Sequence, residues 1–103
     1  MATREIRWHP RAITDAEQAR DWYARRSPLA ARAFLLALDK AVEAVRLDPE
    51  RWPASTAGCR RYLIPGSFPY GLIFRVHSVI EVVAVAHERR RPGFWAQRGS
   101  MEP

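Results

Sequence analysis

The stretch YGLIFRVHSVIEVVAVA, residues 70–86, decides the fold. It holds two runs of strand length, 70–76 and 79–86, that are rich in β-branched and aromatic residues and are separated only by His77 and Ser78. A two-residue connection between such runs predicts an antiparallel hairpin. The second run is apolar on both faces apart from Glu81, so we expect it to be the central strand of a sheet, covered by helices.

Two further runs of residues predict strands. CRRYLI, residues 59–64, follows the proline-containing loop at 47–58 and precedes the turn PGSFP at 65–69. Near the N-terminus, REIRWHP at 4–10 alternates apolar and charged side chains and ends at a proline, which is typical of a short strand.

The region between the first strand and the loop predicts two helices. Thr14 and Glu17 have the spacing of a capping box, so the first helix is predicted to begin there and run to about Arg26. Ser27 and Pro28 suit the cap and first turn of a second helix, which is predicted to end near residue 47. The residues at helical spacing, many of them alanines that favour a closely packed helical hairpin, are Ala16, Ala19, Trp22 and Tyr23, then Ala30, Ala33, Phe34, Ala37, Leu38, Ala41, Val42 and Val45.

These elements predict an α+β fold in the order β-α-α-β-β-β, with the helical hairpin on one face of the sheet and the last three strands antiparallel. We expect one domain over residues 1–103, with a core at about 4–98. After Trp95 we expect a single helical turn or a flexible tail.

The charge of the chain is strongly basic. Seventeen arginines and lysines against 11 acids give a net charge of +6, and Lys40 is the one lysine among them. This balance favours an anionic partner, either nucleic acid or an acidic protein segment, although a GC-rich genome also produces an arginine bias. The single cysteine, Cys59, excludes an intrachain disulfide, and no spacing of residues predicts a metal or cofactor. No apolar run predicts a signal peptide or membrane span, so a cytoplasmic location is expected.

Polar residues on the predicted strands form the candidate site. Arginine pairs suit phosphate binding, and aromatic rings suit base stacking. Each residue also has a purely structural interpretation: arginines at strand ends are often solvated, a histidine ending a strand is often hydrogen-bonded, and aromatics after Pro-Gly often close a core. Arg75 is expected to point outward from the sheet face opposite the helices. The candidates for binding an anion or target are Arg61, Arg75, His87, Arg89, Arg90 and Trp95.

The segments DWYARRSP, RRYLIPGSFPYGLIFRV and VAVAHERRRPGFW, with the intervening WP, resemble the ParE/RelE superfamily of bacterial toxins over residues 4–98. The resemblance implies a toxin of a type II toxin–antitoxin system, neutralised by a cognate antitoxin whose tail wraps the helices and the sheet. It also implies one of two targets. RelE-like members cut messenger RNA on the ribosome, and ParE-like members poison DNA gyrase.

Comparison with the RelE-like pattern favours the ParE-like branch. If the chain were a nuclease, the resemblance would implicate Arg60, Arg61, Arg75 and His87 in catalysis. However, the strand arginine of that pattern falls at Gly71, and its C-terminal tyrosine falls near Phe94 or Trp95, neither of which transfers a proton. We therefore expect a gyrase-inhibiting toxin. The alternatives are a ribosome-dependent messenger RNA endonuclease and a non-toxic domain that only binds its partner.

Overall fold

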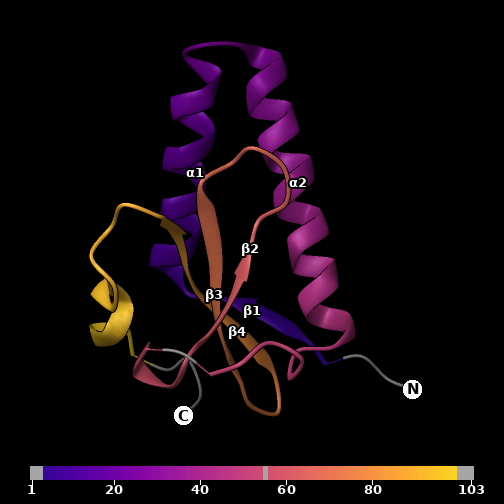
Figure 1. The fold of residues 1–103 in the computed structure, drawn as a ribbon, viewed down its shortest axis with the longest axis vertical. Helices are drawn as coiled ribbons and strands as arrows, with labels where there is room; N and C mark the ends of the chain where they lie inside the picture. The colour runs from indigo at the N-terminus through magenta and orange to yellow at the C-terminus, as the bar shows by residue number, and fades with distance from the viewer. Residues whose placement is uncertain (1–3, 55, 100–103) are drawn as a thin grey trace.

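The protein is described by a computed structural model that covers residues 4–54 and 56–99. Its sheet has four strands in the order β1-β4-β3-β2, so the last strand in sequence is internal, as predicted (Figure 1). β2 and β3 are antiparallel, as are β3 and β4, which confirms the predicted arrangement of the last three strands. β1 lies parallel to β4 on its other side.

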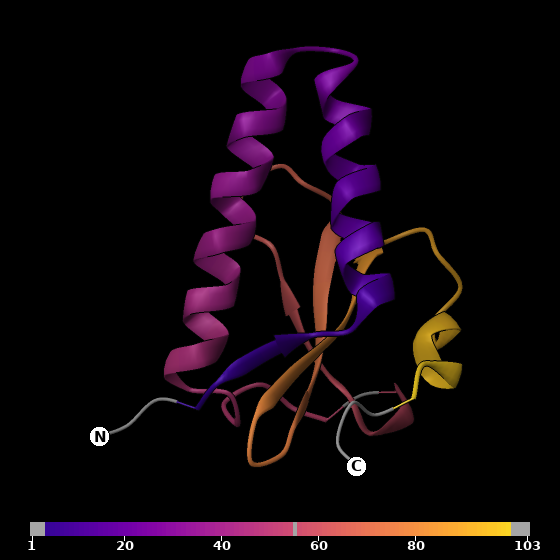
Figure 2. The same cartoon turned by 180° about the vertical axis from the view of Figure 1, so that it is seen from behind.

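Two helices form a hairpin that covers one face of this sheet (Figure 2). The order of elements agrees with the predicted α+β fold. In chain order the elements are β1 (Ile6–Trp8), α1 (Pro10–Ala24), α2 (Pro28–Leu47), the short 3-10 turn η1 (Thr56–Gly58), β2 (Arg60–Leu63), β3 (Tyr70–Val76), β4 (Ile80–His87) and a second 3-10 turn, η2 (Phe94–Gln97). A helical turn was expected after Trp95, whereas η2 begins before it and includes it. The tail at 100–103 lies outside the described residues.

The start of α2 confirms the prediction and the start of α1 corrects it. The Ser27 side chain accepts hydrogen bonds from the amides of Leu29 and Ala30, and Pro28 occupies the first turn. In α1, however, the cap is His9, whose Nδ1 accepts from the amide of Arg11 at 3.1 Å. The Thr14 hydroxyl instead donates to the Pro10 carbonyl from within the helix.

His9 replaces the predicted capping box because β1 ends directly at α1. The His9 amide donates to the Val82 carbonyl at 2.8 Å, so the chain leaves the sheet and enters the helix at one residue. Burial lowers the pKa of His9, with the positive charge of Arg98 acting in the same direction, and this favours the neutral ring that a cap acceptor requires. A local spacing rule could not include this tertiary constraint.

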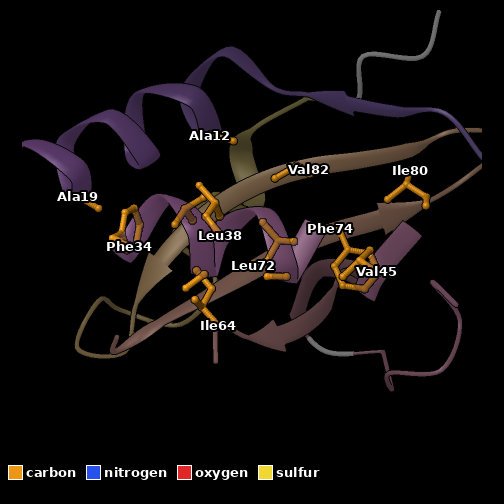
Figure 3. Packing of buried hydrophobic residues seen from close by; sticks show 13 residues of the cluster. Ala12, Ala19, Phe34, Leu38, Val45, Ile64, Leu72, Phe74, Ile80 and Val82 are labelled. Carbon is orange, nitrogen blue, oxygen red and sulfur yellow. The ribbon is translucent and has the colours of Figure 1, made fainter. Parts of the chain in front are cut away.

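The main core lies between the helical hairpin and the sheet (Figure 3). Phe34 of α2 is fully buried and stacks on Tyr23 of α1, with ring centroids 5.3 Å apart. Three predicted helix positions lie outside this core: Trp22 is 44% exposed, Ala33 is exposed, and Ala30 is half-buried without belonging to the cluster. The buried residues of this cluster are Ala12, Ala19, Phe34, Ala37, Leu38, Ala41, Val45, Ile64, Leu72, Phe74, Ile80, Val82 and Val85.

A second, smaller core occupies the other face of the sheet. The register of β4 against β3 shifts by one residue at Ile73/Phe74, so Val83 and Ala84 both contribute to this second cluster. Trp95 of η2 packs against them and is 5% exposed, which confirms that this aromatic residue closes the fold. Arg75 lies on this face, opposite the helices, as predicted. The prediction that it points outward was wrong, because Arg98 of the C-terminal segment contacts it and its side chain is 15% exposed.

Candidate functional site

A small cavity of about 110 Å³ lies where β2, β3 and the end of β4 meet the C-terminal turn. Four of the predicted candidates line it: Arg61, His87, Arg90 and Trp95. The structure thus brings together residues from three separate segments of the chain. The other residues of its wall are Thr56, Ile73, Ala86, Glu88 and Pro92.

Arg61 reaches this cavity by lying across Gly71 of the neighbouring strand. A Cβ atom on Gly71 would be 2.7 Å from Arg61 Nε and 3.3 Å from its Cγ. The glycine is therefore a place where a long side chain crosses the sheet, and not a turn. Gly71 stands where the RelE-like pattern has its strand arginine. In this protein the side chain of Arg61, from the adjacent strand β2, covers that position.

His87 and Arg90 are held by the turn that follows β4. His87 Nδ1 accepts a hydrogen bond from the Arg89 amide at 3.0 Å, and its carbonyl accepts from the Arg90 amide at 3.0 Å. Since Nδ1 accepts, the proton of the neutral ring lies on Nε2. The guanidinium of Arg90 lies 3.8 Å from the centroid of the Phe94 ring. Both side chains are therefore positioned before any ligand binds.

The remaining candidates lie elsewhere. Arg60 donates to the carbonyls of Glu50 and Trp52, so it fixes the loop before β2. Arg75 donates to Glu81 Oε1 and to the Arg98 carbonyl, each at 2.8 Å, and its side chain is 15% exposed. Arg89 is exposed and does not line the cavity. The four residues implicated in a nuclease are thus split between the cavity and two structural contacts.

Sequence reasoning missed a buried ion pair beside Arg75. Arg98 donates to Asp15 Oδ2 at 2.7 Å and to the Val83 carbonyl at 2.8 Å, and both charged side chains are 8% exposed. Asp15 Oδ2 also accepts from the Val85 amide at 3.1 Å. These side chains bond to β4 backbone groups beyond the end of β1. No signal in the sequence points to the pair, because 83 residues separate its members.

Cys59 lies in the same second core and offers no reactive thiol. Burial raises its pKa, while the positive charge of nearby Arg75 acts in the opposite direction. The residue is fully buried, and it is a free cysteine. No group of histidine, cysteine, aspartate and glutamate side chains among residues 4–54 and 56–99 is arranged to hold a metal ion.

A second surface feature is an apolar groove of about 330 Å³ on the helical hairpin. Ile13 of α1 and Leu35 of α2 line it and are 46% and 40% exposed. Exposed apolar side chains that line a groove are typical of a surface where another protein binds. The rest of the lining is Trp8, Ala16, Glu17 and Arg20.

This chain is similar to known proteins both in sequence and in fold. Residues 6–92 match the family model of the ParE toxin of the type II toxin–antitoxin system parDE. A solved structure described as the chromosomal ParDE TA system from P. aeruginosa is similar in fold, with a TM-score of 0.59 and 21% sequence identity. The match covers 82% of this chain and 96% of that one. No curated protein sequence matches.

Among the described residues, neither helix combines the length and the apolar character that a membrane span requires.

Proposed function

Because this chain belongs to the ParE toxin family of type II toxin–antitoxin systems, we propose that it arrests growth by inhibiting DNA gyrase in the cytoplasm and that a cognate antitoxin neutralises it. The fold and the basic charge of +6 support this proposal. The observation that carries the choice of target is the dispersal of the nuclease residues, since Arg60 and Arg75 are engaged in structural contacts.

RNA cleavage through the 2′-hydroxyl requires a base, an acid and cations for the phosphate at one place. The cavity supplies two arginines, the exposed carboxylate of Glu88 and a histidine whose Nδ1 is already used by the Arg89 amide. Trp95, near the position that the C-terminal tyrosine occupies in the RelE-like pattern, is buried and has no hydroxyl group. This arrangement favours a toxin that acts by binding over one that acts by cleavage.

A pulse of expression in growing bacteria tests the target. We expect DNA breaks and filamentation while messenger RNA stays intact, because gyrase poisoning leaves cleaved DNA behind. DNA damage, message integrity and translation are followed in the same culture. Codon-positioned message cleavage without DNA damage would instead establish the nuclease, and an absence of growth arrest would leave a domain that only binds its partner.

The Arg61→Ala/His87→Ala variant serves as the matched control in this experiment. Both side chains lie at the cavity and neither belongs to the main core. A gyrase toxin with an intact fold is expected to keep much of its toxicity, whereas a nuclease that uses this cavity is expected to lose it. Circular dichroism of the purified variant shows whether the fold is retained.

We propose that the antitoxin binds the apolar groove between α1 and α2 through an amphipathic segment. Ile13 and Leu35 offer apolar side chains that no other part of the described chain covers, and Arg20 at the rim offers a positive charge to an acidic partner. Burying both residues in a complex would also explain why a monomer exposes them.

Replacing Leu35 with aspartate is expected to weaken antitoxin binding by roughly 10- to 100-fold, because burying a charge without a partner costs more than the apolar contact contributes. Binding of the protein encoded by the adjacent reading frame is measured by calorimetry. Leu63→Asp is the matched control, since Leu63 is 57% exposed on β2 and lies outside the groove. Equal weakening by both variants, or by neither, would contradict this assignment.

A further inference from the structure

The geometry points to a phosphate-binding site at the cavity formed by Arg61, His87 and Arg90, whose ligand is the backbone of a nucleic acid. This inference goes beyond the proposed toxin function and does not depend on which target the toxin has. Three observations support the site: the positions of Arg61 and Arg90, the volume of the cavity, and the exposed arginines Arg89 and Arg91 beside it.

The two arginines at the cavity are available to an incoming anion. Within the described part of the chain, neither guanidinium is in an ion pair: Arg61 lies over Gly71, and Arg90 lies over the Phe94 ring. By contrast, Arg75 and Arg98 on the same side of the sheet are neutralised by Glu81 and Asp15. A guanidinium presents paired N–H donors that match two phosphate oxygens, and both arginines line the same cavity.

The cavity suits a small oxyanion better than a whole ligand. At about 110 Å³ it is well below the roughly 300 Å³ at which pockets for drug-sized molecules begin. Three of its lining residues, Ile73, Ala86 and Trp95, are buried and apolar, whereas its charged residues Arg61, Glu88 and Arg90 are exposed. Nε2 of His87 carries the proton of the neutral ring and is one further donor. Glu88 is the one acidic residue in the wall among the described residues.

The surroundings indicate that the phosphate belongs to a polymer. Arg90 and His87 also line a second groove, of about 240 Å³, together with Trp22, Tyr70 and Gln18. The acidic residue of this groove, Asp15, is neutralised by Arg98. Arg89 and Arg91 flank Arg90 and are exposed. A strand whose phosphate occupies the cavity would therefore meet further cations and an aromatic groove beside it, which is how proteins follow a nucleic-acid backbone.

The test measures binding of a fluorescein-labelled DNA duplex to the purified full-length chain at several salt concentrations. The Arg61→Gln/Arg90→Gln variant is expected to lose at least about tenfold in affinity. The slope of log affinity against log salt concentration should become shallower by about 1.8, because two fewer phosphates are neutralised. The matched control, Arg11→Gln/Arg32→Gln, removes the same charge from exposed helix positions outside the cavity and is expected to bind almost as the unaltered chain.

Gly71→Ala gives a second variant that conserves charge. The new methyl group displaces the Arg61 side chain, which is flexible, so the fold is expected to persist while DNA affinity falls severalfold. Inorganic phosphate is the third probe and should compete weakly with the duplex. Equal losses in the two arginine variants would overturn the site in favour of diffuse charge. Phosphate binding as tight as duplex binding would overturn the assignment to a nucleic-acid backbone.

Discussion

Replacing Arg98 with methionine is expected to lower the free energy of unfolding by about 3–5 kcal/mol. The substitution keeps much of the side-chain volume but leaves the carboxylate of Asp15 buried without its cation. It also removes the donor to the Val83 carbonyl. A chain of this size is stabilised by roughly 5–15 kcal/mol in total, so the expected loss is a large fraction of its stability. Urea unfolding followed by circular dichroism measures it.

Two further variants show whether the loss of stability comes from the buried Asp15–Arg98 pair or from the removal of any arginine. Arg20→Met removes an exposed partner of Asp21 and is expected to cost less than about 1 kcal/mol. In the Asp15→Asn/Arg98→Met variant no charge is left uncompensated, and the asparagine keeps an acceptor for the Val85 amide. This variant is expected to recover part of the loss. If Arg98→Met were as stable as Arg20→Met, the C-terminal segment would not be anchored by this pair.

Replacing Phe34 with alanine is expected to cost about 3–5 kcal/mol of unfolding free energy. Phe34 is fully buried at the centre of an aromatic cluster, where its ring contacts those of Tyr23, Phe68 and Tyr70 at centroid distances of 5.3–5.5 Å. The substitution removes these contacts and leaves a cavity that rigid helix and strand backbones cannot close. Urea unfolding again measures the change.

Leu36→Ala is the control for this core position. Leu36 lies two residues further along the same helix and is 57% exposed, so its truncation is expected to change the stability by less than about 1 kcal/mol. A similar small effect for Phe34→Ala would contradict the placement of the main core between the hairpin and the sheet.

Features that depend on neighbouring residues could be predicted from the sequence. The cap at Ser27, the antiparallel pairing of β3 with β4 and the central place of β4 follow from local hydrogen bonding, a short connection and an apolar strand. The connection itself has three residues, 77–79, and not the predicted two. The cap of α1 could not be predicted in this way. Thr14 has the right spacing, but the pairing of His9 with Val82 starts the helix earlier.

In the candidate site, too, some features could be predicted from the sequence and others depend on tertiary contacts. The sequence identified Arg61, His87, Arg90 and Trp95 as polar or aromatic residues at strand ends, and the structure brings them to one cavity. It could not show that Arg75 is neutralised, because this depends on Glu81 across the hairpin and on the carbonyl of Arg98 from the C-terminal segment.

The sequence by itself determined the order of the elements, the strand polarity of the last three strands and the basic character of the protein, since these depend on periodicity, short connections and composition. Only the tertiary structure decided that the second face of the sheet is covered by the C-terminal turn and which arginines are available. Both depend on the Asp15–Arg98 pair and on the packing of Trp95. These contacts join residues far apart in the chain, and their free energy exists only once the backbone has brought them together.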